Sequence, residues 1–199
     1  MKNSNNLHPT KSWWQTSTHV SFLRRTPATI CWTLSFPFGN FNARSFWLAN
    51  ASEKRRLRKV SVKGDGRCLF RAIAKCLAQN DGRSLPEHLE VADADALRKE
   101  AYNIICVQQR ERFEKSMIIE GNIHRYCREL LKPTFYGGEP EILVLSEVFQ
   151  VPIQVYLQTE SGEYKMIVEY GKPFMRKGVA PVRLLYNGVN HYDALMEYK

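Results

Sequence analysis

A cysteine follows a glycine-containing loop in the segment Gly64–Phe70, which reads GDGRCLF. Apolar residues recur at helical spacing from Cys68 to Gln79, so the cysteine is predicted to begin a helix. A helix N-terminus favours negative charge and thus the thiolate, which is the nucleophilic form. Free N–H groups of that turn can face an oxyanion, and Asp65 can fix the loop by accepting amide protons. A cysteine near a helix start can also be an inert structural thiol, so this loop alone does not show that Cys68 is a nucleophile.

A histidine near the other end of the sequence could serve this thiol as a base. His191 lies in the run Asn190–Asp193, directly after an asparagine-glycine turn at 187–188. At the edge of a short strand it could reach a helix N-terminus across a cleft. Asp193 comes two residues later, so in a strand both side chains point to one face. Its carboxylate can accept the second imidazole N–H and fix the tautomer. A lone histidine here would be read as a surface residue, but with the cysteine loop it predicts a Cys–His–Asp set.

Three blocks of the sequence resemble, in order and spacing, the signature blocks of the ovarian-tumour (OTU) cysteine proteases. They are GDGRCLFRAI at 64–73, YGGEPEI at 136–142 and NHYDAL at 190–195. Three ordered blocks are far more specific than one short motif. The resemblance covers about residues 58–198 and is closest to small plant OTU enzymes. The chain departs from the family pattern at Tyr136, where the family usually has tryptophan; either ring could pack the same loop.

The resemblance implies a papain-like α/β fold and isopeptidase activity on ubiquitin conjugates. It makes Cys68 the nucleophile, His191 the general base, Asp193 the residue that orients the histidine, and Asp65 the aspartate counted with the catalytic set. It implies ubiquitin and polyubiquitin chains as partners and no metal or organic cofactor, and we expect a monomer. Two alternatives stay open: a non-catalytic OTU module that binds ubiquitin, or a papain-like hydrolase of another ubiquitin-like modifier. Linkage preference cannot be read from the sequence.

The elements that must position these residues follow from periodicity and turn residues. Helical patterns come first and β-rich runs follow, which favours an α+β fold with a mostly antiparallel sheet packed on helices. Asp93 or Asp95 is predicted to cap the long helix, and Gly137 and Gly138 either admit a substrate backbone or form a tight turn into the Pro140 helix. The predicted elements are a strand at 60–62, helices at 68–79, 93–117, 122–131 and 139–149, and strands at 153–157, 165–169, 182–186 and 192–196, with a loop at 80–92.

The net charge of +9 would suit a nucleic-acid-binding protein if it lay on the folded domain. Residues 1–59 contain ten Lys and Arg and one acidic residue, whereas residues 60–199 contain nineteen of each sign. The basic excess therefore belongs to the extension, and we expect no nucleic-acid partner. No apolar run approaches the roughly 18 residues that a membrane-spanning helix needs, so no membrane partner is expected either.

Five cysteines, at positions 31, 68, 76, 106 and 127, show no metal-binding spacing. Cys76 and Cys106 have apolar neighbours in helical patterns and are interpreted as small core residues. We therefore expect reduced thiols in an intracellular, cytoplasmic protein. The remaining histidines, and Tyr102, Tyr126 and Cys127, are not assigned to the site.

We divide the chain into an extension, residues 1–55, and a catalytic domain, residues 56–199. Residues 1–52 contain no Asp or Glu, thirteen Ser and Thr, and aromatic residues without periodicity. This composition is typical of an organelle transit peptide, here for a plastid, or of a disordered leader without an address. The basic run at 53–59 is predicted to be a solvated linker or a short helix.

Overall fold

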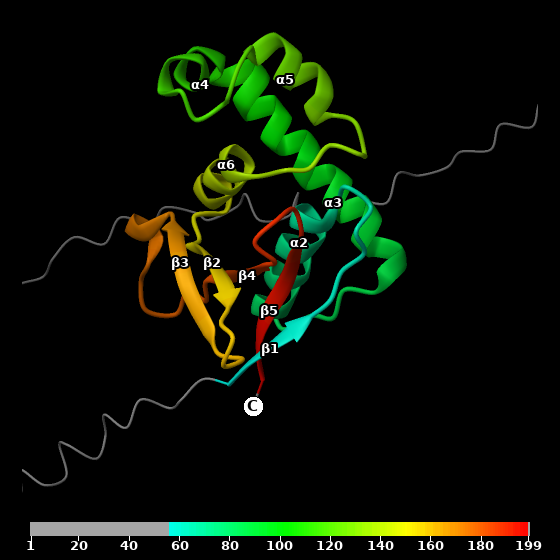
Figure 1. Ribbon diagram of the computed structural model, residues 1–199, viewed down its shortest axis with the longest axis vertical. Coiled ribbons are helices and arrows are strands. Elements are labelled where there is room, and N and C mark those ends of the chain that lie inside the picture. Colours follow the sequence, from blue (N-terminus) through cyan, green and yellow to red (C-terminus); the bar gives the residue numbers. More distant parts are fainter. Residues whose placement is uncertain (1–55, 199) are drawn as a thin grey trace, which may run out of the picture. The chain divides into compact units, whose positions relative to one another are not determined.

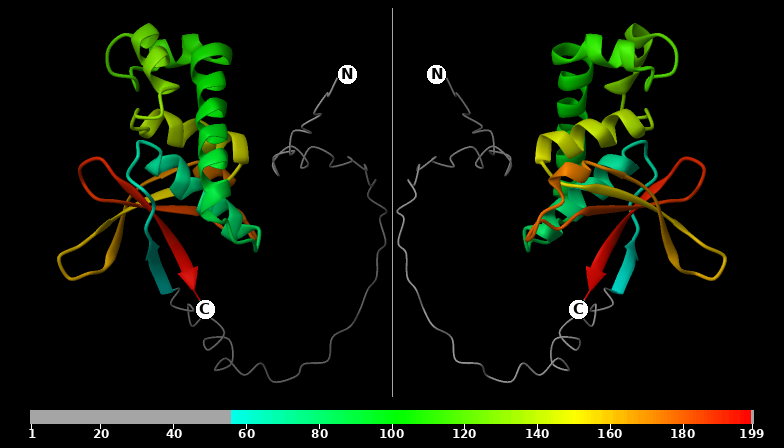
Figure 2. Two further views of the ribbon diagram at one scale, coloured as in Figure 1. Left: turned by 90° about the vertical axis from the view of Figure 1, so that its right-hand side faces the viewer. Right: turned by 90° about the vertical axis from the view of Figure 1, so that its left-hand side faces the viewer.

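The computed structural model of the chain describes residues 56–198. Strands form one sheet, and helices cover it and extend beyond it (Figures 1 and 2). In chain order the elements are β1 (Arg56–Val60), α2 (Cys68–Asn80), α3 (Glu87–Tyr102), the π-helical turn η2 (Asn103–Gln108), α4 (Arg110–Ser116), α5 (Ile123–Leu130), α6 (Glu139–Phe149), β2 (Ile153–Gln158), β3 (Tyr164–Tyr170), the 3₁₀ turn η3 (Lys172–Phe174), β4 (Val182–Tyr186) and β5 (Tyr192–Tyr198).

The sheet has the strand order β1-β5-β4-β2-β3. Strands β2 and β4 run parallel, and the other neighbouring pairs run antiparallel, so the predicted α+β fold with a mostly antiparallel sheet is confirmed. Helix α2 packs on β4 and β5 and against α3. Leu69, Phe70 and Ile73 are fully buried there, and burying each such side chain stabilises the fold by about 1.5–3 kcal/mol. The cysteine thus begins the central helix of the core.

Most predicted elements lie where the periodicity placed them, but the basic run before the first block does not. It was predicted as a linker or short helix, and the strand was placed at 60–62. Instead Arg56–Val60 is strand β1, paired antiparallel with β5 from Arg56 opposite Tyr198 to Val60 opposite Ala194. An edge strand with polar side chains has no alternating apolar signal, and its hydrogen bonds come from a partner far along the chain.

The long helix also begins earlier than predicted. Pro86, in extended backbone, precedes the first helical residue. Glu87 and Glu90 lie in the first turn, where negatively charged carboxylates interact favourably with the helix dipole. Asp93 and Asp95 are therefore inside α3 and do not cap it. Beyond Tyr102 the helix passes through the π-helical turn η2 before α4, which ends at Ser116 and is followed by Met117 in left-handed backbone. Helices α4 and α5 gather at the end of α3 that is far from the sheet (Figure 1). Among residues 56–198 we find no helix long and apolar enough to cross a membrane.

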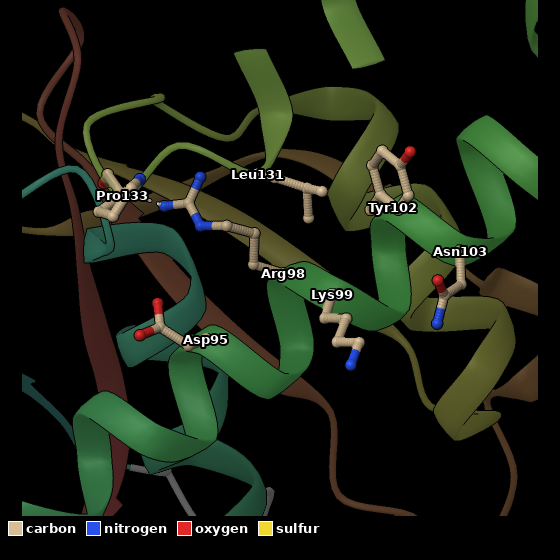
Figure 3. A pocket seen from close by; sticks show the side chains of 7 residues that line it. All are labelled: Asp95, Arg98, Lys99, Tyr102, Asn103, Leu131 and Pro133. Atoms are coloured by element: carbon tan, nitrogen blue, oxygen red, sulfur yellow. Dashed lines mark hydrogen bonds between the residues drawn. The ribbon is translucent and has the colours of Figure 1, made fainter. Parts of the chain in front are cut away.

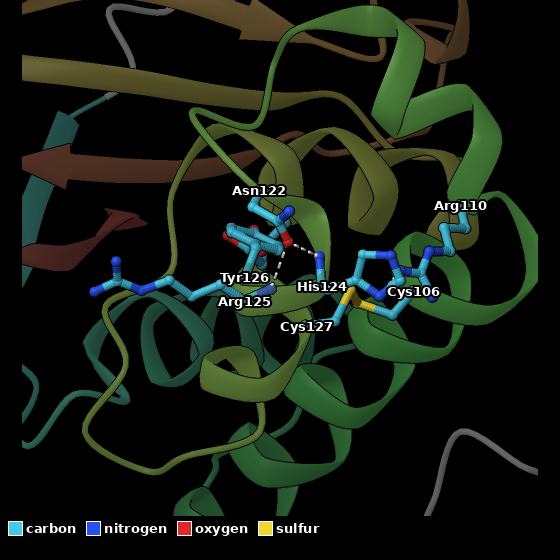
Figure 4. The surroundings of a disulfide bond; sticks show 8 residues. Cys106, Arg110, Asn122, His124, Arg125, Tyr126 and Cys127 are labelled. Atoms are coloured by element: carbon cyan, nitrogen blue, oxygen red, sulfur yellow. Dashed lines mark hydrogen bonds between the residues drawn. A yellow bond between two sulfur atoms is a disulfide. The ribbon is translucent and has the colours of Figure 1, made fainter.

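The prediction that all cysteines are reduced thiols is wrong for two of them. Cys106 in η2 and Cys127 in α5 form a disulfide, with Cα atoms 5.8 Å apart (Figure 4). They are separated by 21 residues, and only the return of the chain through α4 to α5 brings them together. Cys68 and Cys76 are free thiols, and Cys31 and the rest of the extension lie outside the described residues.

We expect this disulfide to contribute stability without contributing to the chemistry. Closing a loop of this length should stabilise the folded chain by about 3 kcal/mol, which corresponds to roughly 10 °C in melting temperature. The double variant Cys106→Ser/Cys127→Ser should therefore melt about that much lower than the wild type while keeping Cys68 reactive with iodoacetamide. Thermal unfolding with and without dithiothreitol measures the effect. A variant with an unchanged melting temperature in both conditions would contradict the prediction.

Candidate active site

Cys68 is the first residue of α2 and is only 2% exposed. The first intrahelical bond runs from the Arg71 N–H to the Arg67 carbonyl over 2.8 Å, so the N–H groups of Cys68 to Phe70 precede the helical ladder. The Cys68 Sγ lies 4.0 Å from the carbonyl oxygen of Asn190, the residue before His191. The fold therefore joins the cysteine loop and the histidine loop, which are more than 120 residues apart in the sequence.

The loop before Cys68 depends on glycine at position 66. Gly66 has a φ of +81°, and a Cβ atom on it would lie 2.2 Å from the carbonyl oxygen of Pro133. Both the left-handed backbone and the close approach of another loop therefore exclude a side chain. The loop containing Gly66 is held directly against the segment 133–134.

The loop that presents His191 is organised by one side chain. The Oδ1 atom of Asn187 accepts hydrogen bonds from the backbone N–H groups of Val189, Asn190 and His191, each over 2.9 Å. The Asn187 N–H donates in turn to the His191 carbonyl over 3.0 Å. The sequence predicts a turn at Asn187, but this capping of the whole loop is visible only in the structure.

The imidazole of His191 has different surroundings at its two nitrogen atoms. Its Nε2 lies 3.1 Å from Oδ1 of Asp193, two residues along β5. Its Nδ1 faces the cysteine loop, because a Cβ atom placed on Gly64 would lie 3.6 Å from it. Asp193 also accepts the Val62 N–H over 3.0 Å. The hydrogen bond that strand spacing predicts between His191 and Asp193 is therefore present, and the second nitrogen is directed toward the loop of Cys68.

Asp65 belongs to a different set of contacts. Its carboxylate accepts hydrogen bonds from Arg71 at 2.6 and 3.2 Å and from the Arg67 N–H at 3.1 Å. Burial raises the pKa of Asp65, but the bonds from Arg71 and Arg67 outweigh it and hold the pKa below its usual value. Arg71 is buried in α2 and also binds Glu90 of α3 over 3.0 Å. Asp65 thus fixes the cysteine loop to α2, and the structure does not join it to His191.

The two glycines of the second block have different surroundings, and only Gly137 packs against the start of α2. A Cβ atom on Gly137 would come within 2.9 Å of Leu69 and 3.1 Å of the Phe70 ring. Gly138 precedes α6, and its N–H donates to the Glu141 carboxylate over 2.7 Å. Gly137 is therefore needed for close packing on α2, and Gly138 lies at the turn into α6 with open space where a side chain would be.

Several residues of this region carry no signal in the sequence. Arg71 and Arg98 each bind partners that the fold brings close, and an arginine within an amphipathic helix is usually interpreted as part of a solvated face. Burial, and then the charges of Tyr186 and Cys68, raise the pKa of Tyr192 to about 12. Its phenol is therefore protonated at neutral pH.

Comparison with known proteins places this site in a family. The family model described as OTU-like cysteine protease matches residues 63–194. The Arabidopsis thaliana protein named OVARIAN TUMOR DOMAIN-containing deubiquitinating enzyme 3 is 39% identical over 153 residues, which cover 67% of this chain and 65% of the relative. Enzyme 4 of the same series is 37% identical over 139 residues, which cover 69% of this chain and 42% of the relative.

Solved structures show the same fold. The OTUD1 OTU domain superposes with a TM-score of 0.55 at 22% identity, covering 70% of this chain and 85% of that domain. An OTU domain solved in complex with ubiquitin gives a TM-score of 0.54 at 22% identity, covering 74% of each chain. Because the family model covers the cysteine loop, the glycine pair and the histidine strand together, the chain belongs to the OTU-like cysteine proteases.

Proposed function

We propose that this protein is a thiol isopeptidase that hydrolyses the bond at the C-terminus of ubiquitin in conjugates or polyubiquitin chains. The observation that carries the proposal is the imidazole of His191, bound at Nε2 by Asp193 and directed by Nδ1 toward the loop of Cys68. The relatives named as deubiquitinating enzymes and the ubiquitin-bound OTU structure support ubiquitin as the modifier.

The proposed reaction follows from the two nitrogen positions. Asp193 accepts the Nε2–H of His191, which leaves Nδ1 unprotonated and able to take the Cys68 proton. The thiolate then attacks the carbonyl carbon of the ubiquitin C-terminus, and N–H groups at the start of α2 stabilise the oxyanion. The imidazolium returns its proton to the leaving lysine amine, and a thioester remains. Water, deprotonated by His191, attacks the thioester and releases the ubiquitin carboxylate and the Cys68 thiol.

The hydrogen bonds of the cysteine loop limit which amides can bind the oxyanion. The Arg67 N–H is already bound to Asp65 over 3.1 Å, so it is not available to an oxyanion in this arrangement. We therefore assign the oxyanion to the N–H of Cys68 and its neighbours in the free first turn of α2. The role of Asp65 is to hold the loop.

A panel of ubiquitin dimers, one for each linkage, tests the proposal when incubated with wild-type protein and with Cys68→Ala. We expect the wild type to cleave at least one linkage and the variant to cleave none. A wild type that leaves every dimer and a fluorogenic ubiquitin amide intact, yet binds ubiquitin, would favour the non-catalytic module. Cleavage confined to a different modifier, offered in the same assay, would favour the second alternative. We propose that the active form is a monomer, which light scattering during the assay tests.

The extension is expected to be dispensable for catalysis. It has none of the three matched blocks, and residues 60–199 are balanced in charge. A chain lacking residues 1–55 should cleave ubiquitin substrates within about threefold of the full-length rate. Deleting residues 1–60 is the matched control, because it also removes β1, which pairs with the strand that carries Asp193. That longer deletion should lose stability and activity. Failure of the chain lacking residues 1–55 to fold would show that the domain needs the extension.

Our proposed location is the cytoplasm, with a plastid as the alternative if the extension is a transit peptide. A fusion of residues 1–55 to a fluorescent protein separates the two. Import and cleavage would identify a transit peptide. A fusion that stays cytosolic and full length would identify a leader without a targeting signal.

A further inference from the structure

Arg98 of α3 is a buried arginine that binds backbone carbonyls instead of a carboxylate. It is only 2% exposed. Its Nη2 donates to the Gly66 carbonyl over 2.7 Å and to that of Pro133 over 3.4 Å. Its Nη1 donates to the carbonyls of Leu130 and Phe135, each over 3.0 Å. One guanidinium therefore connects the loop before Cys68 with the segment that leads to the glycine pair.

A charge in this position costs stability, so its presence needs a geometric reason. Burial lowers the pKa of Arg98, and the charge of Asp95 offsets this only in part. The guanidinium carbon lies 4.6 Å from the centre of the Phe70 ring, and this cation–π contact offsets part of the free-energy cost of removing the charge from water. Well-packed apolar residues usually fill such a position at lower cost. The planar fork of arginine can hold several carbonyls at fixed angles, which an apolar side chain cannot do.

The segment held by Arg98 borders a pocket on one side. A pocket of about 340 Å³ separates Leu131 and Pro133 from the face of α3 that carries Lys99 and Tyr102, and Arg98 lines it (Figure 3). On the opposite side, Pro133 presses on Gly66 so closely that a Cβ atom there would not fit. The hydrogen bonds of Arg98 therefore fix the position of 130–135 against the cysteine loop.

The same contacts fix the peptide unit between Gly66 and Arg67, one residue before Cys68. The Gly66 carbonyl and the Arg67 N–H belong to one planar peptide group. Arg98 holds the carbonyl over 2.7 Å, and the Asp65 carboxylate holds the N–H over 3.1 Å. With both edges held, this plane is fixed, and only the φ and ψ angles of Arg67 separate it from the N–H of Cys68.

We propose that Arg98 is a positioning residue for hydrolysis, which aims the N–H groups at the start of α2 toward the oxyanion. The proposal rests on the isopeptidase function proposed above and goes beyond it, because Arg98 touches neither the substrate nor the catalytic side chains. An aimed donor matters most when negative charge develops on the carbonyl oxygen. Losing the hydrogen bonds from Arg98 to these carbonyls should therefore lower kcat and leave KM nearly unchanged.

The variants Arg98→Lys and Arg98→Gln, made in the full chain, test the positioning role of the Arg98 guanidinium. Lysine keeps the charge and glutamine keeps two N–H donors, but neither keeps the fork. Arg112→Lys is the matched control, since Arg112 binds Glu147 on the surface and contacts no residue of the cysteine loop. Each protein is assayed with a fluorogenic ubiquitin amide, with ubiquitin aldehyde and with iodoacetamide across pH. The aldehyde forms a tetrahedral adduct that uses the oxyanion donors, whereas iodoacetamide reports only the thiolate.

We expect kcat of both Arg98 variants to fall about 10- to 100-fold, because losing one oxyanion donor outright costs about 10²–10³. Affinity for the aldehyde should fall by a similar factor, while KM stays within about threefold and the pH profile of alkylation does not move. A folded Arg98→Lys with wild-type kcat and aldehyde affinity would overturn the proposal. So would a parallel loss of alkylation, or failure of both variants to fold, since Arg98 would then act on the thiol or on the whole fold. Failure of the proposed function is recognised separately, by a wild type that does not turn over the amide.

Discussion

Replacing Cys68 by alanine is expected to abolish both turnover of ubiquitin substrates and labelling by an electrophilic ubiquitin probe. The thiolate is the only protein group in the proposed mechanism that bonds to the carbonyl carbon, so no rate should remain beyond that of water in the site. Removal of one sulfur atom from the first helical turn should change the free energy of unfolding by no more than about 1 kcal/mol. Turnover, mass spectrometry of the labelled protein and thermal unfolding measure the three quantities.

The other thiols provide the control for this result. Burial raises the pKa of Cys76 to about 11, so it is almost wholly protonated at neutral pH. It also donates to the Arg183 carbonyl over 3.3 Å, inside the core. Cys106 and Cys127 are joined to each other. Cys76→Ala should therefore keep both turnover and labelling. Label found on any cysteine other than 68, or turnover by Cys68→Ala, would show that the nucleophile is assigned wrongly.

The sequence predicts elements well where periodicity and end signals agree. Cys68–Asn80 begins after a glycine loop and is apolar at helical spacing, and Glu139–Phe149 has proline in its first turn, which the structure confirms. The start of α3 was placed wrongly because Asp93 and Asp95 look like capping residues. Asp95 instead binds Arg67 across a tertiary contact, with Oδ1 2.7 Å from Nε. Local propensity cannot distinguish a cap from such a partner.

The contacts of the candidate active site differ in the same respect, because those within one strand can be predicted and those between separate elements cannot. The pairing of His191 with Asp193 depends on two residues of one strand, so the spacing of two was enough to predict it. The contacts of Arg71 with Glu90 and of Arg98 with Gly66 join elements that touch only after folding. The disulfide is hidden for the same reason, since nothing in the pattern shows that α5 returns to η2. Sequence spacing therefore predicts a contact within one strand better than the contacts that join separate elements.

His191→Ala is expected to remove essentially all turnover, at least about 10⁴-fold, because the base that activates the thiol and protonates the leaving amine is lost. Asp193→Ala should retain about 10²-fold more activity than His191→Ala. A carboxylate that orients the imidazole improves its geometry without itself transferring the proton. Steady-state kinetics on a fluorogenic ubiquitin amide, with protein folding checked by circular dichroism, measure both losses.

Asp193→Asn is the variant that separates orientation from support of the strand. The Oδ1 of Asp193 accepts from both the Val62 N–H and the His191 ring, and an asparagine oxygen can accept from both in the same place. The Asn variant should therefore keep the fold and more activity than Asp193→Ala, losing only the charge that stabilises the imidazolium. Lys59 lies 3.8 Å from the carboxylate and should become more mobile without affecting the rate. Equal and complete losses in Asp193→Ala and His191→Ala would show that Asp193 supports the structure of β5 and does not orient the base. Full activity in Asp193→Ala would mean that another residue orients His191.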